Sequence, residues 1–123
     1  MLIKKIDLRI SLLFLKRGEL RHLTPEMMIE EMQSFSNYAT LKAVPVTIKH
    51  LLHMGFQREG SVLLAQYKEK ELFVEFKYIL NEKGAIIGFE LNDVPLPPPQ
   101  YLHHIQGLCW EITHKIMYYR GVF

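Results

Sequence analysis

Six histidines and one cysteine are the residues of this chain that most often supply a metal ligand or a nucleophile. His50 and His53 are spaced to lie on one face of a helix. His103 and His114 share one helix face but lie roughly 16 Å apart along the axis, too far to bind one ion. A zinc site needs three or four converging ligands, and Glu59 is the one carboxylate near the first pair. We therefore expect no metal and no cofactor.

The sequence also lacks a nucleophile with its base. Cys109 has no histidine three or four positions away on its own side of a helix, and Ser11 and Ser61 lie in strand patterns without a nucleophile elbow. Gly84 and Gly88 are not followed by a helix and so make no phosphate loop. We predict no catalytic residue and a protein that is not an enzyme. Cys109 lies on an apolar stripe and is interpreted as a buried small hydrophobic residue.

The element that organises the chain is a predicted C-terminal helix over residues 100–119, preceded by three prolines. Its inner stripe recurs at helical spacing and consists of Leu102, Ile105, Cys109, Ile112 and Ile116. The opposite side is not the Lys and Glu surface of a solvated helix. It carries His103, Gly107, Trp110, His114, Met117 and Tyr118. Such a face is covered either by the N-terminal segment of the same chain or by a partner.

The preceding segments predict an antiparallel sheet and two short helices. Residues 6–14 alternate in the strand period, residues 16–19 form a turn, and residues 19–23 return, which makes an N-terminal hairpin. Helices are predicted to start after Thr24, with Met28, Met32 and Phe35 inward, and after Thr47, with Ile48, Leu51 and Leu52 inward. Residues 61–67, 71–80 and 85–91 form a meander that ends in the proline-rich residues 92–99. The fold class is α+β, with an antiparallel meander sheet that the N-terminal hairpin could extend, two short helices, and the C-terminal helix packed on one face of the sheet.

Length and composition are those of one globular domain over residues 1–123. The single cysteine excludes an internal disulfide and suits a reducing compartment. No stretch approaches the roughly 18 apolar residues of a membrane span, and the N-terminus lacks the pattern of a signal peptide. We expect a cytoplasmic protein without a membrane partner.

The basic residues concentrate near the N-terminus, although the formal net charge is only +2. They are Lys4, Lys5, Arg9, Lys16, Arg17 and Arg21. A cluster of this kind on a hairpin could contact phosphates, so a nucleic-acid-associated protein is one alternative. Asp7 interrupts the cluster, which makes nucleic acid the less favoured partner.

Two segments resemble a family of small bacterial proteins of prophages and other mobile elements. The first covers residues 45–56 (PVTIKHLLHMGF) and the second covers residues 101–113 (YLHHIQGLCWEIT). The resemblance extends over about residues 45–117. It departs from the family at Gly107, where asparagine is usual, and at His114, where glycine is usual. The resemblance implies a phage or mobile-element accessory protein and brings no activity, cofactor or catalytic residue.

These observations favour a non-enzymatic module that binds another protein, of the host or a second copy. The predicted contact residues are His103, Trp110, His114, Met117 and Tyr118, because aromatic and Met side chains are favoured at the centres of interfaces. Inhibition of a host defence protein is the most specific form of this hypothesis. A homodimer formed through the C-terminal helix is a further alternative.

Overall fold

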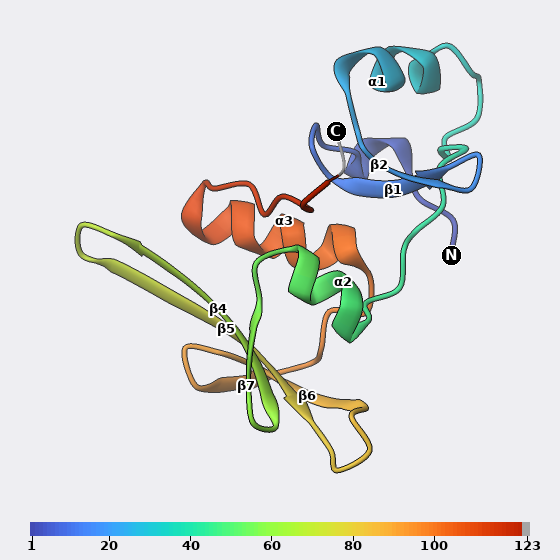
Figure 1. Ribbon diagram of the computed structural model, residues 1–123. Coiled ribbons are helices and arrows are strands. Elements are labelled where there is room, and N and C mark those ends of the chain that lie inside the picture. Colours follow the sequence, from blue (N-terminus) through green and yellow to red (C-terminus); the bar gives the residue numbers. More distant parts are fainter. Residues whose placement is uncertain (122–123) are drawn as a thin grey trace.

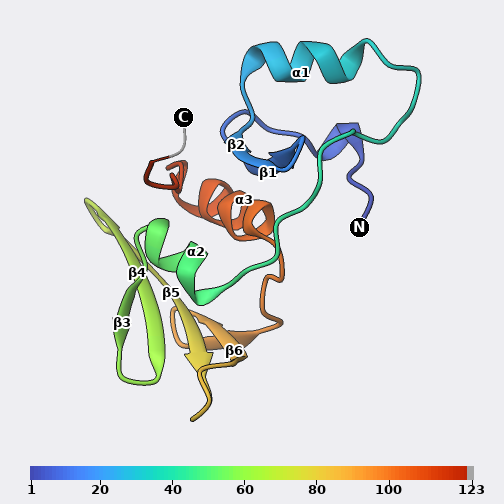
Figure 2. The same ribbon diagram turned by 45° about the vertical axis from the view of Figure 1, so that its right-hand side comes forward.

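The protein places its C-terminal helix between two β-sheets (Figure 1). The structure is a computed structural model that describes residues 1–121. Helix α3 (Leu102–Thr113) and helix α2 (Ile48–His53) lie against one face of a five-stranded sheet. The N-terminal hairpin and helix α1 (Pro25–Met32) lie on the other side of α3, as the turned view also shows (Figure 2). The predicted α+β class is confirmed.

The five-stranded sheet is an antiparallel meander in the order β3-β4-β5-β6-β7. The strands are β3 (Gln57–Glu59), β4 (Val62–Glu69), β5 (Leu72–Leu80), β6 (Ile86–Leu91) and β7 (Val94–Leu96). The three central strands match the predicted segments, whereas β3 and β7 were not predicted. Pro95 is tolerated in β7 because this strand lies at the sheet edge, where a missing N–H leaves no ladder bond unmade.

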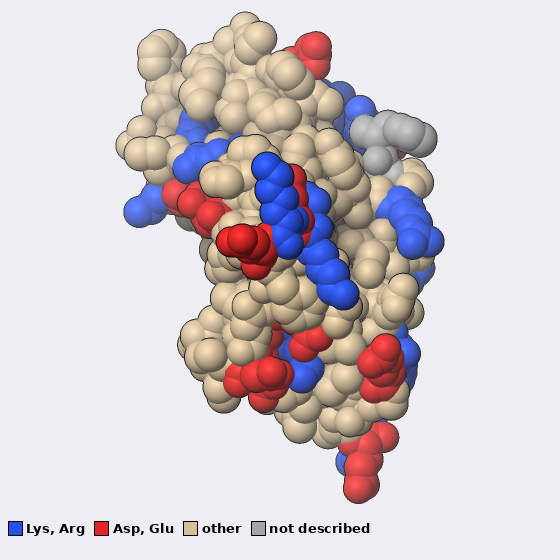
Figure 3. All heavy atoms as spheres, turned by 90° about the vertical axis from the view of Figure 1, so that its left-hand side faces the viewer, with Lys and Arg blue, Asp and Glu red and all other residues tan. Residues whose placement is uncertain are grey.

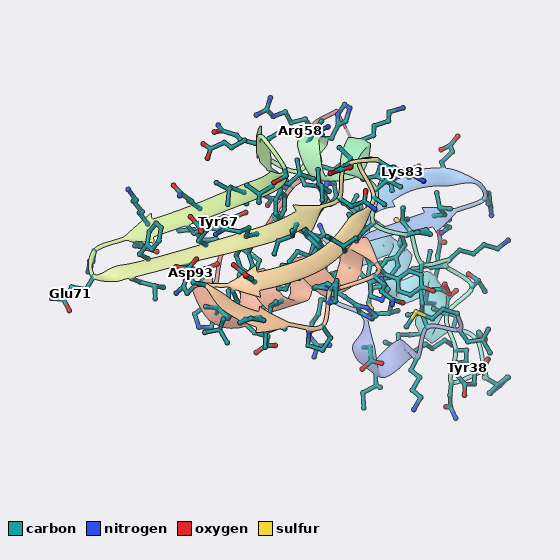
Figure 4. The ribbon with its side chains drawn as sticks, turned by 90° about the horizontal axis from the view of Figure 1, so that it is seen from below. Tyr38, Arg58, Tyr67, Glu71, Lys83 and Asp93 are labelled. Carbon is teal, nitrogen blue, oxygen red and sulfur yellow. The ribbon has the colours of Figure 1, made fainter. Side chains whose placement is uncertain are left out.

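The main hydrophobic core fills the space between this sheet and the two helices. Val74, Phe76 and Tyr78 alternate inward along β5, as their spacing predicts, and meet Leu102 and Ile105 of α3. Beyond the core the β4–β5 hairpin extends past the rest of the sheet, with Glu71 at its tip (Figure 4). The hairpin ends in charged residues because no other element covers it there.

Helix α2 begins and ends as its sequence predicts. The Thr47 side chain accepts a hydrogen bond from the His50 N–H, and Gly55 adopts φ 98° just after the helix. Leu51 is fully buried. The prediction that Leu52 faces inward is wrong, because a helix this short presents only one narrow stripe to the core.

The N-terminal segment does not form the long strand predicted over residues 6–14. It contains a short 3₁₀ helix, η1 (Lys5–Asp7), followed by β1 (Leu13–Lys16) and β2 (Glu19–His22), which pair as a separate two-stranded sheet. Ser11 adopts φ 75°, and its N–H donates to the Leu23 carbonyl. The alternation of apolar residues is real, but a turn at Ser11 interrupts it and turns Ile10 toward the surface.

Helix α1 starts at the predicted cap, where the Thr24 side chain accepts from the Met27 N–H at 3.2 Å. Of its predicted inner side, Met28 is partly buried and packs on a small N-terminal core, but Met32 and Phe35 are exposed, and the buried residues are Met27 and Glu31. The Glu31 carboxylate accepts hydrogen bonds from the N–H and the hydroxyl of Thr40, at 2.8 Å and 2.6 Å. These bonds to the following loop turn the Glu31 side of the helix inward.

Helix α3 ends earlier than its apolar pattern predicts. Thr113 donates to the Cys109 carbonyl at 2.7 Å and accepts from the Lys115 N–H at 3.0 Å, and His114 between them adopts φ 55°. The chain then leaves the helix as an irregular segment, residues 115–121, called here the C-terminal strap. The predicted helix over residues 100–119 is therefore too long by its last turns, because a left-handed residue cannot continue a right-handed helix.

Candidate functional site

The second face of α3 is partly covered by the N-terminal hairpin of the same chain, which was one of the two predicted forms of cover. Gln106 is the anchor of this contact. Its Oε1 accepts from the Leu13 N–H at 2.7 Å, and its Nε2 donates to the Met117 carbonyl at 2.8 Å and the Ser11 carbonyl at 3.3 Å. One buried amide thus joins the hairpin, α3 and the C-terminal strap.

Two of the five predicted contact residues lie inside the fold. His103 is 7% exposed and Met117 is 1% exposed, so neither side chain offers a surface to a partner. The expectation that the five residues form one exposed face is therefore wrong. Met117 lies beyond the end of α3, and the strap folds it back into the core.

His103 is a packed neutral side chain. Its ring lies 5.0 Å from the ring of Phe14 and 4.2 Å from that of His104, measured between centroids. Its buried Nδ1 has no hydrogen-bond partner among residues 1–121. Burial lowers the pKa of His103 to about 4, and the nearby His104 adds to this effect.

A groove remains open along the uncovered part of α3, and it encloses about 290 Å³. Trp110 is one of its lining residues, and its side chain is 42% exposed. The walls come from the turn before β1, from α3 and from the start of the C-terminal strap. The α3 groove, as it is called below, is lined by Arg9, Ile10, Ser11, Leu12, Gln106, Gly107, Trp110, Glu111, Ile116 and Met117.

Gly107 lines this groove and also a neighbouring hollow of about 410 Å³. Apart from its chain neighbours and the nearby backbone of α3, a Cβ added at this position would meet no atom within 4 Å. Glycine inside a helix costs about 0.5–1 kcal/mol relative to alanine, and neither a tight contact nor a positive φ of this residue requires it. The internal packing of the protein therefore does not explain a glycine here.

A second hollow continues the apolar surface past Ile10 and Ser11, which line both. It encloses about 460 Å³ between the end of β2, the start of α1 and the strap. Tyr118 lines it and is largely exposed, with its ring 5.6 Å from that of His22. Trp110, Ile10 and Tyr118 thus form one apolar surface across the hairpin, α3 and the strap.

Histidines that looked like metal-ligand candidates hold the C-terminal strap in place. His50 Nδ1 lies 2.9 Å from the Tyr119 hydroxyl, and the His53 ring stacks on the Tyr119 ring at 5.0 Å. His22 donates from Nδ1 to the Ser11 carbonyl and accepts from the Tyr119 N–H at Nε2. Within the part of the chain that the structure describes, no three His, Cys, Asp or Glu side chains are grouped so that they could hold a metal ion.

The six basic residues of the nucleic-acid alternative do not form one free surface. Lys5 is buried, and its ammonium group donates to the Ser34 carbonyl at 3.0 Å. Lys16 is paired with Glu30, and Arg21 lies 3.7 Å from Glu19. Lys4 and Arg9 are exposed and line one hollow, whereas the exposed Arg17 lies in the β1–β2 turn.

The charged side chains on the outer surface are mixed in sign. On the face that Figure 3 presents, positive and negative side chains lie intermingled over the middle and lower parts. The surface above them is largely uncharged. This face offers no continuous basic track for a nucleic-acid backbone.

Most of the groove lining was not predicted from the sequence, and two isoleucines were assigned to other places. Ile10 appeared to belong to the inward face of a strand, and Ile116 to the core stripe of the helix, but both lie at the groove rim. One signal was present in the sequence, namely the aromatic and histidine face centred on Gly107.

Comparison with protein-family models, with curated proteins and with solved structures finds no match to this chain. None of the helices within residues 1–121 is long and apolar enough to span a membrane.

Proposed function

We propose that this protein is a non-enzymatic module that binds another protein through the α3 groove. The observation that carries the proposal is a half-exposed Trp110 in the lining of an apolar groove, next to Gly107, which adds no side chain to it. Tryptophan and tyrosine are the residues most enriched at energetically important interface positions. Ile10 and Tyr118 extend the same surface, so its apolar centre spans three segments of the chain.

Residues 45–117 resemble proteins of prophages and other mobile elements. This resemblance supports the proposal that the protein is a phage or mobile-element accessory protein. In that setting the partner is a host protein, and inhibition of a defence protein is the most specific form of the proposal. A cytoplasmic location is part of the same proposal.

The nucleic-acid alternative is less well supported, because Lys5 and Lys16 are engaged within the fold. A homodimer would cover the same groove with a second copy, and sedimentation of the purified protein at increasing concentration distinguishes this case from a foreign partner.

The test is affinity capture from the natural host with three forms of the protein: wild type, Trp110→Ala and Phe35→Ala. Phe35 is a matched control because it is a fully exposed aromatic side chain that does not line the groove. We expect a partner that the wild type and Phe35→Ala retain and that Trp110→Ala loses, with cooperative unfolding preserved in all three.

Two results contradict the proposal. If the Trp110→Ala variant captures the same partner as the wild type, the contact lies outside the α3 groove. Loss of cooperative unfolding in that variant shows that Trp110 belongs to the core.

A further inference from the structure

We infer that the partner contributes an extended segment, which pairs as an added β-strand with the free edge of the C-terminal strap at Ile116 and Tyr118. This inference rests on the proposed function and names the chemistry of the partner. Three features carry it: the alternating exposure of the strap, its unpaired backbone groups, and the apolar side chains beside them.

The strap has the side-chain alternation of a β-strand, although it belongs to neither of the two sheets within residues 1–121. Ile116 and Tyr118 are exposed, whereas Met117 and Tyr119 are buried in the main core. A period of two in burial is that of an extended chain with one packed face. Residues 116–119 therefore form a packed strand without a partner strand in the described chain.

The two edges of this strand differ in their hydrogen bonding. In an extended chain the N–H and C=O of one residue point to the same edge, and those of the next residue point to the opposite edge. On one edge the Met117 carbonyl and the Tyr119 N–H are bonded to side chains of α3 and β2. On the other edge the N–H and C=O groups of Ile116 and Tyr118 form no hydrogen bond within residues 1–121.

The free edge ends at Arg120, whose N–H donates to the His53 carbonyl at 2.9 Å. Arg120 follows Ile116 and Tyr118 on the same edge, so a backbone carbonyl from another segment already reaches this edge at one position. An extended peptide would continue that pairing with its own N–H and C=O groups. A helix bonds its backbone groups internally and has none to offer along its side. The unpaired groups thus favour an extended occupant.

The side chains at the free edge favour apolar residues in that occupant. Residues of an added strand that lie opposite Ile116 and Tyr118 project from the same face and contact these two side chains directly. Ile116 also lines the α3 groove, and Tyr118 lines the second hollow, so this contact is continuous with the surface around Trp110. The occupant is therefore an extended segment in which apolar residues alternate with others.

The probe is the peptide acetyl-Thr-Val-Thr-Val-Thr-Lys-amide, and its binding is followed by amide hydrogen exchange measured with NMR. In the free protein the amides of Ile116 and Tyr118 should exchange rapidly, whereas the Arg120 amide should be protected by its bond to His53. Saturating peptide should slow exchange at Ile116 and Tyr118 at least about tenfold and leave Arg120 unchanged.

Two N-methylated peptides separate strand pairing from general apolar contact. N-methylation of both valines removes the N–H groups that face the strap and should weaken binding at least about tenfold. N-methylation of the third and fifth residues adds the same two methyl groups where the N–H groups face away, and should leave the affinity within about threefold.

Two variants test the donor on the protein. Tyr118→Pro removes the backbone N–H at the free edge, whereas Tyr118→Ala removes the ring and keeps the N–H. We expect Tyr118→Pro to weaken binding at least about tenfold more than Tyr118→Ala, with cooperative unfolding in both.

The inference is overturned if the peptide does not bind, if the valine-methylated peptide binds like its parent, or if Ile116 and Tyr118 stay unprotected in the complex. Protection of both amides in the free protein that rises with protein concentration would also overturn it, because a second copy then occupies the edge. These failures differ from failure of the proposed function. A host partner that Trp110→Ala loses and Tyr118→Pro retains would keep the binding module and reject only the added strand.

Discussion

Replacement of Gly107 by alanine should stabilise the protein. Gly107 lies in the middle of α3, where alanine is favoured over glycine by about 0.5–1 kcal/mol because it loses less backbone freedom on folding. The added Cβ meets no atom within 4 Å, so no steric cost offsets this gain. For a chain of this length the gain corresponds to a rise in the melting temperature of about 2–4 °C.

Urea unfolding followed by circular dichroism measures this change as a higher midpoint with an unchanged slope. Gly84→Ala is the control, because Gly84 adopts φ 79° in the β5–β6 turn and alanine there is strained by about 1 kcal/mol. The two substitutions add the same methyl group and should act in opposite directions. If Gly107→Ala destabilises the protein, the fold itself needs the glycine, and the argument that its space is kept for a ligand is refuted.

Substitutions at three further positions test internal contacts and a helix cap. Gln106→Ala should cost about 2–4 kcal/mol in urea unfolding, since it strands the Leu13 N–H and the Met117 carbonyl; a change below about 1 kcal/mol would contradict the anchoring role. The free energy of unfolding should fall by up to about 3 kcal/mol as pH decreases from 6.5 toward 4, because the unfolded chain protonates His103 in this range and the folded chain does not. His103→Phe should flatten that decline, and an identical pH profile in the variant would exclude His103 as its cause. Thr24→Ala should cost about 1 kcal/mol through loss of the α1 cap, whereas Thr24→Ser should stay close to wild type in the same assay.

Elements with strong local signals could be predicted from the sequence. Thr24 and Thr47 cap the helices at the predicted places, and the alternation along β5 predicts which of Val74, Phe76 and Tyr78 face the core. The α+β class follows from these signals because capping, turn chemistry and strand alternation each depend on residues close together in the chain.

The errors occur where distant contacts decide the structure. The pattern around Ile10 is that of a strand, yet the Ser11 N–H bonds to Leu23 and the chain turns. The pattern of α3 continues past Thr113, yet His114 ends the helix and the strap returns Met117 to the core. In each case the apolar pattern allows two conformations; the bond from Ser11 to Leu23 selects the turn, and the Thr113 hydroxyl with the left-handed His114 selects the end of α3.

The sequence by itself determined that the C-terminal helix has two faces without the Lys and Glu residues of a solvent-exposed surface. It also pointed to Gly107 and Trp110 as the centre of the second face. Only the tertiary structure decided how that face is divided. Gln106 and the N-terminal hairpin cover one part of it, and the α3 groove leaves the other part open. An apolar pattern in the sequence indicates which side chains avoid water. Which distant segment covers each of these side chains depends on how the whole chain packs.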